Sequence, residues 1–403
     1  MPAFVFPGQG SQHPGMGRAW TEHPSWELVG DVASAADRDI AHLLLHAGRE
    51  ELTETRNAQL VTFTMGLVVL DAIERLGIEP TSVAGHSVGE YTALVAAGAL
   101  GFEDGVRVVT ERGAAMQAAA DARPGIMLLV SGCDGESARI ACQLADGAAW
   151  VANYNTPDEV VLAGDPAAVE RAAAIAKTLG AQGATRVVVG GAFHTPFMAA
   201  ARSRLSKALA EATFHEPEVP VVANVDSLPH ATAEEWDVLL RAQMVSPVRW
   251  HQSVLRLAGA LGDPARGESM FVEVGPGGSL SSMIRRTVPG VTTVALARPD
   301  DLDRLVDAMA GDTVLHAYAS GHQGERLYVS ERMVISPCPG IFEPAAATGD
   351  ELGEGTPIDV GTLLGTVAST EVRSPFEGTL MGVLAHPGER VQTGQPLAWL
   401  RAH

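Results

Sequence analysis

Residues 83–90 read Val-Ala-Gly-His-Ser-Val-Gly-Glu and carry the clearest sign of the fold. A short apolar strand runs into a turn that matches the GxSxG pattern, and residues 88–97 have the composition of a helix. In a chain with 43 glycines, the bare pattern also fits an ordinary Gly-Ser turn. The strand before it and the helix after it favour a nucleophile elbow, in which Ser87 is exposed beside a helix N-terminus that can hold an oxyanion.

The surrounding chain alternates strand-like and helical segments. From residue 1 to about 310, short apolar pieces such as residues 4–6 are followed by Ala- and Leu-rich stretches such as residues 64–76. This alternation is typical of an α/β fold. The sequence therefore predicts a large α/β domain over residues 1–310.

Residues 122–192 interrupt this domain with a different rhythm. The expected order is strand, helix, strand, strand, helix, strand, which is typical of a split βαβ unit. The last expected strand is the apolar triplet at residues 187–189. We therefore expect an inserted ferredoxin-like subdomain at about residues 122–192.

The composition changes again towards the C-terminus. Residues 311–326 are rich in Gly, Ser and His and are expected to form a linker. In residues 327–403 the helical stretches vanish and short apolar pairs alternate with Pro and Gly. This pattern predicts a small all-β domain.

Composition and charge exclude several classes of protein. A length of 403 residues suggests two or three domains, and the net charge of −20 argues against nucleic acid or an anionic membrane as a partner. Three cysteines without CxxC spacing fit neither a disulfide scaffold nor a zinc site, so no metal is expected. With no apolar run near 20 residues and no signal peptide, we expect a cytoplasmic protein.

A serine nucleophile needs a base, and the chain offers thirteen histidines. His194 follows the apolar triplet at residues 187–189, and catalytic groups often lie at such strand ends. A solvated loop histidine is the competing interpretation. His86 is less suited as the base, because it would point from the opposite side of the elbow.

Five segments together resemble a known family. They are residues 6–12 (Phe-Pro-Gly-Gln-Gly-Ser-Gln), 85–90, 111–113 (Glu-Arg-Gly), 192–194 (Ala-Phe-His) and 273–277 (Glu-Val-Gly-Pro-Gly). In this order and spacing they closely resemble the malonyl-CoA:acyl carrier protein transacylases and the acyltransferase domains of polyketide and fatty acid synthases. The resemblance covers residues 1 to about 310 and implies an α/β-hydrolase-like body.

The resemblance implies a mechanism. Ser87 would take the acyl group from a coenzyme A thioester and pass it to the phosphopantetheine thiol of an acyl carrier protein, with His194 as general base and acid. A backbone carbonyl at the position of Gln243 would orient the imidazole. The N–H groups of Val88 and Gln12 would form the oxyanion hole, at roughly 3–4 kcal/mol per donor.

Two further positions bear on the acyl group. Arg112 matches the arginine with which the family grips the free malonyl carboxylate, although a surface charge is the ordinary fate of an arginine. Residues 191–194 read Gly-Ala-Phe-His, close to the His-Ala-Phe-His of malonyl-selective domains, so Phe193 would fill the space of an α-methyl group. Gly191 departs from that pattern and is expected to loosen the wall for a larger acyl unit.

Other residues are assigned by the same resemblance. His86, Asn153 and Asn155 are expected near the bound acyl chain, with turn formation as the alternative for the asparagines. Arg285 and Arg286 are expected to face the acidic carrier protein, with a solvated helix face as the alternative.

The C-terminal region resembles a second family. Residues 372–380 and 388–397 resemble the second half of biotinyl and lipoyl carrier domains, which are flattened barrels. Residues 366–371, where those domains carry the attachment lysine, contain none, and Lys177 and Lys207 are the only lysines in the chain. No covalently bound cofactor is therefore expected, and the domain is expected to serve docking or self-association.

The sequence thus predicts a malonyl transferase that works through an ester on Ser87, with malonyl-CoA and an acyl carrier protein as substrates. Two alternatives remain at this point: a hydrolase that removes wrong acyl groups from carriers, and an inactive carrier-binding scaffold. Nucleic acid and membrane partners are not expected.

Overall fold

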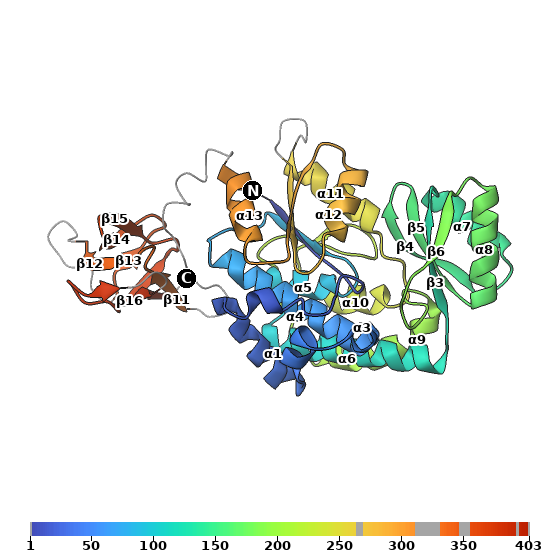
Figure 1. Cartoon of the computed structure of the whole chain (residues 1–403), viewed down its shortest axis with the longest axis horizontal. Coiled ribbons are helices and arrows are strands. Elements are labelled where there is room, and N and C mark those ends of the chain that lie inside the picture. Colours follow the sequence, from blue (N-terminus) through green and yellow to red (C-terminus); the bar gives the residue numbers. More distant parts are fainter. Residues whose placement is uncertain (1, 263–268, 311–330, 346–354, 392–394, 402–403) are drawn as a thin grey trace. The chain divides into compact units, whose positions relative to one another are not determined.

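The computed structural model describes residues 2–262, 269–310, 331–345, 355–391 and 395–401 (Figure 1). Its contacts divide the chain into two compact units, Met1–Val69 with Pro80–Asp301 and Leu70–Glu79 with Leu302–His403. The expected linker at residues 311–326 lies outside the described residues. The domain boundaries given above stay a prediction.

The first unit is built on a six-stranded sheet whose strand order is β10-β9-β1-β2-β7-β8. All neighbours are parallel except β8, which is antiparallel to β7. The strands are β1 (Ala3–Phe6), β2 (Ser82–Gly85), β7 (Val221–Val222), β8 (Pro229–His230), β9 (Met270–Val274) and β10 (Thr292–Leu296). Every residue of β1 and β2 is buried, as in parallel sheets with both faces covered. The expected mixed α/β fold is confirmed.

Helices surround this sheet, and two of them matter most for the site. The helix α5 (Gly89–Ala96) begins directly after the GxSxG turn, and α6 (Phe102–Ala122) carries Arg112. Outside residues 122–192, the other α-helices in the described part of the chain are α1 (Glu27–Ala36), α2 (Ile40–Leu45), α3 (Arg49–Thr53), α4 (Thr55–Glu74), α9 (Ala199–Ala210), α10 (Trp236–Gln243), α11 (Trp250–Leu261), α12 (Ser279–Thr287) and, almost entirely in the second unit, α13 (Asp301–Ala310).

A smaller antiparallel sheet, ordered β4-β5-β3-β6, is inserted between α6 and α9. It consists of β3 (Ile126–Ser131), β4 (Ala149–Thr156), β5 (Glu159–Gly164) and β6 (Gly183–Arg186), with helices α7 (Gly135–Leu144) and α8 (Pro166–Thr178). Small apolar side chains of both helices pack in one core with those of the sheet.

The expected strand at residues 187–189 is wrong. The fourth strand is β6, which pairs with the edge of β3 from Gly183 to Arg186. As an edge strand it is largely exposed and polar, so it carries no apolar signal. Val188, in the apolar triplet, has 79% of its surface exposed and lies in irregular chain.

The described residues between 331 and 401 form two antiparallel four-stranded sheets, ordered β11-β18-β16-β13 and β15-β14-β12-β17. The strands are β11 (Glu331–Ile335), β12 (Gly340–Pro344), β13 (Pro357–Ile358), β14 (Leu363–Val367), β15 (Thr370–Arg373), β16 (Gly378–Val383), β17 (Arg390–Val391) and β18 (Pro396–Arg401). Leu380 and Leu397 are buried in a common core, whereas Val383 is 38% exposed.

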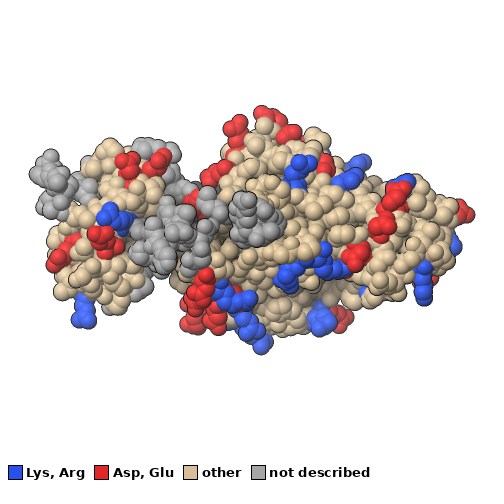
Figure 2. Space-filling model, turned by 90° about the horizontal axis from the view of Figure 1, so that it is seen from above, with Lys and Arg blue, Asp and Glu red and all other residues tan. Residues whose placement is uncertain are grey.

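No described helix combines the length and apolar character needed to cross a membrane. On the face seen in Figure 2, lysines and arginines are interspersed with aspartates and glutamates. That face offers no broad basic area, in keeping with the net charge of −20.

Candidate active site

The turn after β2 has the geometry of a nucleophile elbow. Ser87 has a φ of +56°, in the left-handed region that non-glycine residues rarely adopt. A Cβ at Gly85 would lie 1.9 Å from the backbone of Gly89, and a Cβ at Gly89 would lie 2.2 Å from the carbonyl oxygen of Phe6. Both glycines are therefore required for the close packing of β1, β2 and α5.

The structure brings Ser87 and His194 together. Ser87 Oγ lies 2.7 Å from His194 Nε2, and both side chains are buried. His194 Nδ1 lies 2.9 Å from the backbone carbonyl oxygen of Gln243. Since a carbonyl oxygen only accepts, Nδ1 carries the proton and the lone pair of Nε2 faces the serine hydroxyl. This is the arrangement that a general base needs.

The imidazole is held in its neutral form. Burial, with a further contribution from the charge of Arg112, lowers the pKa of His194 from 6.5 to about 3. An uncharged imidazole can accept the serine proton at any ordinary pH.

Arg112 is fully buried, so the surface alternative is wrong. Its guanidinium donates to Gln59 Oε1 (2.6 Å), Ser87 Oγ (3.1 Å) and Gln243 Oε1 (2.8 Å), and it lies over the ring of Tyr91. None of these acceptors is a carboxylate, and Arg112 Nε has no partner among the described residues. A buried cation with no carboxylate among its hydrogen-bond partners favours the binding of an anion.

Sequence reasoning missed two amides that hold this site. Gln59, on α4, supports Arg112. Asn224, two residues after β7, accepts the N–H of Ser87 at 2.8 Å and donates to the carbonyl of Gly85 at 2.6 Å. Asn224 had one readable signal, because it follows a parallel strand at the edge where the sheet presents Ser87.

The expected oxyanion donors come from the same edge of the sheet, after β1 and β2. Within the described chain, the N–H groups of Val88 and Gln12 have no hydrogen-bond acceptor. The side chain of Gln12 accepts from Gly10 N at 2.7 Å and donates to Leu52 O at 3.2 Å, which fixes its loop. Their role as an oxyanion hole stays a prediction.

His86 and Asn153 adjoin the elbow. Asn153 Nδ2 lies 3.3 Å from His86 Nε2, and burial lowers the pKa of His86 to about 4. Asn155 donates to Glu159 Oε1 at 3.1 Å, and its side chain also interacts with His86 and partly offsets the effect of burial on the pKa of that histidine. The Oδ1 atoms of both asparagines are buried without a partner among the described residues, so each still has an acceptor to offer.

Phe193 is buried beside Gly191, and the expectation that this glycine leaves extra room is wrong. A Cβ at Gly191 would lie 2.6 Å from the Cβ of Ala120 and 3.3 Å from the ring of Phe193. Here glycine lets the chain before His194 approach α6 closely. The departure from the family pattern therefore reflects closer packing.

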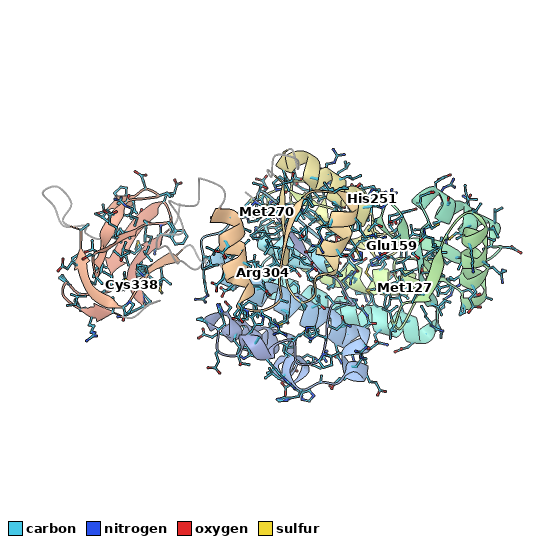
Figure 3. The ribbon with its side chains drawn as sticks, turned by 45° about the horizontal axis from the view of Figure 1, so that its top comes forward. Met127, Glu159, His251, Met270, Arg304 and Cys338 are labelled. Atoms are coloured by element: carbon cyan, nitrogen blue, oxygen red, sulfur yellow. The ribbon has the colours of Figure 1, made fainter. Side chains whose placement is uncertain are left out.

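The two arginines expected to face a carrier differ in their contacts. Arg286 donates to Glu159 Oε2 at 2.6 Å and Asp158 Oδ1 at 2.7 Å, which ties α12 to the smaller sheet (Figure 3 labels Glu159). Arg285 donates to the hydroxyl of Thr293 at 2.6 Å. Arg286 thus has a structural role, and carrier contact stays a prediction for both.

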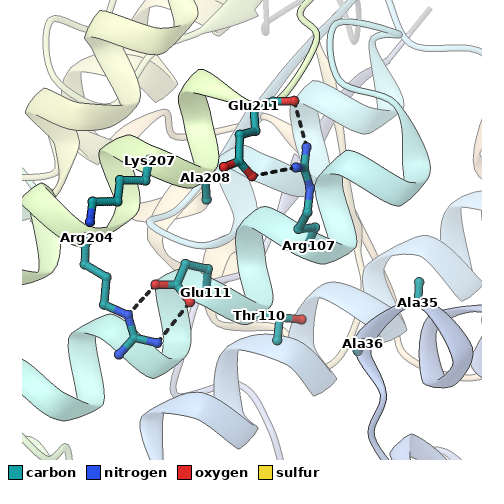
Figure 4. A pocket seen from close by; sticks show the side chains of 9 residues that line it. All are labelled: Ala35, Ala36, Arg107, Thr110, Glu111, Arg204, Lys207, Ala208 and Glu211. Carbon is teal, nitrogen blue, oxygen red and sulfur yellow. Dashed lines mark hydrogen bonds and ion pairs between the residues drawn. The ribbon is translucent and has the colours of Figure 1, made fainter.

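A surface pocket of about 580 Å³ lies between α1, α6 and α9, and neither Ser87 nor His194 lines it (Figure 4). Arg107 is paired with Glu211, and Arg204 with Glu111. Lys207 lines the same pocket, but the pocket is separate from the Ser87–His194 pair. The described residues hold no cluster of three or more metal-ligating side chains.

Comparisons with known proteins agree with the site. Residues 3–320 match the family of acyl transferase domains. The malonyl CoA-acyl carrier protein transacylase of Bacillus subtilis strain 168 is 35% identical over 317 residues, which are 76% of this chain and 96% of that protein. The protein of the same name from Escherichia coli strain K12 is 38% identical over 302 residues, 74% of this chain and 96% of the relative.

Solved structures give the same result. The malonyl-CoA:acyl carrier protein transacylase of Xanthomonas oryzae pv. oryzae KACC10331 has a TM-score of 0.71 at 37% identity and covers 76% of this chain and 97% of its own. A type II PKS acyl-carrier protein in complex with its malonyl-transacylase gives a TM-score of 0.71 at 32% identity, over 77% of this chain and 99% of the matched one. The chain therefore belongs to the acyltransferase family of the malonyl CoA-acyl carrier protein transacylases.

Proposed function

We propose that this protein transfers a malonyl group from coenzyme A to the phosphopantetheine thiol of an acyl carrier protein, through an ester on Ser87. The observation that carries the proposal is the fully buried Arg112, whose guanidinium lies 3.1 Å from Ser87 Oγ with no carboxylate among its hydrogen-bond partners. A cation so close to the nucleophile suits an acyl group with its own carboxylate.

In the first half-reaction, His194 Nε2 takes the proton of Ser87 as Oγ attacks the thioester carbonyl. The N–H groups of Val88 and Gln12 stabilise the oxyanion. The intermediate collapses to the Ser87 ester, and the coenzyme A thiolate leaves with the proton from His194. In the second half-reaction the carrier thiol gives its proton to His194 and attacks the ester carbonyl. The Ser87 oxygen then leaves with the proton from His194, and the malonyl group remains on the carrier as a thioester.

The remaining residues have supporting roles in this proposal. Arg112 pairs with the malonyl carboxylate, Phe193 closes the space of an α-substituent, and His86, Asn153 and Asn155 lie along the acyl pocket. Arg285 and Arg286 face the carrier protein. The relative solved with its acyl-carrier protein supports a carrier as the acceptor.

The proposal also covers two further parts of the chain. The strand order β4-β5-β3-β6 with two helices supports a ferredoxin-like subdomain. The paired sheets of residues 331–401 support a biotinyl/lipoyl-like domain without its lysine, used for docking or self-association. We place the enzyme in the cytoplasm.

The acceptor in the second half-reaction tests the proposal against hydrolysis. The Ser87 ester is formed with labelled malonyl-CoA, and the purified acyl-enzyme is mixed with carrier protein bearing phosphopantetheine. We expect the label to appear on the carrier much faster than free malonate appears, with carrier lacking phosphopantetheine as the control. If free malonate is released rapidly, at a rate that does not depend on the carrier, the protein is a hydrolase. If no ester forms at all, the protein is an inactive carrier-binding scaffold.

A further inference from the structure

The GxSxG turn is followed by a buried glutamate that the mechanism above does not use. Glu90 lies in the first turn of α5, three residues after the nucleophile, and is almost completely buried. Its Oε1 accepts the backbone N–H of Asn224 at 2.6 Å, and its Oε2 accepts from Gln243 Nε2. One carboxyl group thus holds two segments that come from distant parts of the chain.

Each of these segments in turn holds the nucleophile. The Asn224 side chain accepts the N–H of Ser87 at 2.8 Å, and Gln243 Nε2 donates to the carbonyl of Ser87 at 2.9 Å. The N–H of Glu90 itself also donates to that carbonyl at 3.2 Å. The left-handed backbone of Ser87 is therefore fixed from both sides by groups that Glu90 ties together.

Gln243 also holds the base and the arginine. Its backbone carbonyl accepts from His194 Nδ1, and its Oε1 accepts from Arg112. The Gln243 side chain has only one favourable orientation. If Oε1 and Nε2 were exchanged, two acceptors would meet at the carbonyl of Ser87 and two donors would meet at the guanidinium. Glu90 is the partner that keeps this amide in place from the side opposite Arg112.

We propose that Glu90 is a positioning residue for acyl transfer: its carboxyl group holds Asn224 and Gln243 so that Ser87 and His194 stay aligned. The proposal rests on the proposed function for its reaction, although the alignment itself needs no malonyl group. Removing Glu90 leaves two buried donors without an acceptor, which displaces the groups they belong to.

The chain offers a matched control in Glu273, at the end of β9. This buried carboxylate also accepts two N–H groups, from Leu280 and Ser281, at 3.1 and 2.7 Å. Its bonds hold the start of α12 and involve neither Ser87 nor His194. Glu90→Met and Glu273→Met therefore remove the same kind of interaction from the same body at two places.

The experiment measures two reactions of Ser87 in the full-length protein, malonyl ester formation in a single turnover and modification by phenylmethylsulfonyl fluoride, which carries no carboxylate. We expect Glu90→Met to slow both reactions by a similar factor, at least tenfold, with less than a threefold change in the half-saturating malonyl-CoA concentration. Glu90→Gln, which keeps one acceptor oxygen, should recover part of the loss. Glu273→Met should keep both rates within about twofold after correction for the folded fraction by circular dichroism.

A double-mutant cycle with Gln243→Leu adds a test that a general loss of stability would not pass. If Glu90 acts through Gln243, the effects of Glu90→Gln and Gln243→Leu are not additive. Wild-type rates in folded Glu90→Gln and Glu90→Met, equal losses in the two Glu→Met variants, or an additive cycle would overturn the proposal. A wild-type protein that reacts with the sulfonyl fluoride but not with malonyl-CoA would instead contradict the proposed function and leave the role of Glu90 standing.

Discussion

Ser87 and Ser369 both lie in turns with left-handed backbones, as does Ser227, but Ser369 lacks the partners that make Ser87 able to react. Ser87 follows β2 with a φ of +56°, and Ser369 lies in the β14–β15 hairpin with a φ of +71°. Ser87 is buried and contacts His194 and Arg112, whereas Ser369 is exposed and its hydroxyl has no hydrogen-bond partner among the described residues. The unusual backbone presents a hydroxyl in both turns, but reactivity needs a base and a cation brought from elsewhere in the fold.

The hairpin comparison also bears on the missing lysine. Ala368 and Ser369 both have positive φ, as a two-residue type I′ turn requires. The turn is thus well formed, and its two residues carry small side chains without an amine.

Replacing each of the two serines with alanine should give the largest difference in malonyl ester formation. Ser87→Ala should abolish malonyl ester formation, a loss of roughly 10⁴-fold or more, because no other nucleophile faces His194. Ser369→Ala should leave the rate unchanged. Intact-mass spectrometry after exposure to malonyl-CoA measures both, and persistent acylation of Ser87→Ala at the wild-type rate would show that the nucleophile is wrongly assigned.

The pH dependence of acylation distinguishes a buried imidazole, whose pKa is lowered, from an imidazole in water. With the pKa of His194 near 3 and that of His86 near 4, kcat/KM should stay level from pH 7 to pH 5. A base with an ordinary pKa of 6.5 would lose roughly 25-fold over that range. Burial raises the pKa of Glu90 to about 8, so its titration lies above this window.

Stability, unlike activity, should fall as the pH is lowered from 7 to 5. The folded pKa of His194 lies below the unfolded value of 6.5, so the unfolded chain binds the proton first as the pH falls. The stability that the neutral imidazole contributes is complete above pH 6.5 and is lost as the pH approaches 3. Urea unfolding at pH 7 and pH 5 should show that loss, and a sharp fall of kcat/KM near pH 6.5 in protein that stays folded would contradict the assigned environment.

A pair of neighbouring glycines tests the packing before His194. Gly191→Ala puts a Cβ against Ala120 and should slow acylation about tenfold or cost about 1–3 kcal/mol of stability. Gly190→Ala meets nothing closer than 3.7 Å and should be tolerated. The test compares the acylation rates and the urea unfolding midpoints of the two variants. Equal values for both variants would mean that the close contact at Gly191 affects neither activity nor stability.

Removal of residues 327–403 should have the smallest effect on chemistry. The family of acyl transferase domains matches residues 3–320, which leaves out residues 327–403. The two bacterial relatives are matched over 96% of their own length. Ester formation with malonyl-CoA should stay within about twofold, while oligomeric state or transfer to the natural carrier changes. A truncated protein that is folded but no longer acylated would place the C-terminal region in the reaction itself.

The features that could be predicted from the sequence are those that a few neighbouring residues determine. The glycines at 85 and 89 are forced by close backbone contacts, so the elbow was readable from a few residues. Gln59 carried no pattern of its own, and Asn224 had only its place after a parallel strand, because the roles of both depend on which strand ends and helices meet in the fold. The strand at residues 187–189 was misplaced for the converse reason, since an apolar triplet does not identify its partner and the true edge strand is polar.

The central claim is that Arg112 makes the Ser87 site selective for an acyl group with a free carboxylate. The most direct measurement compares the rates at which Ser87 is acylated by malonyl-CoA and by acetyl-CoA, in the wild type, in Arg112→Ala and in the surface control Arg204→Ala. We predict that Arg112→Ala slows malonylation by roughly 10²–10³-fold, the value of a buried charge-assisted pair, while acetylation changes little or improves. Equal losses for both acyl groups in a folded Arg112→Ala protein would contradict the account and make Arg112 a structural residue.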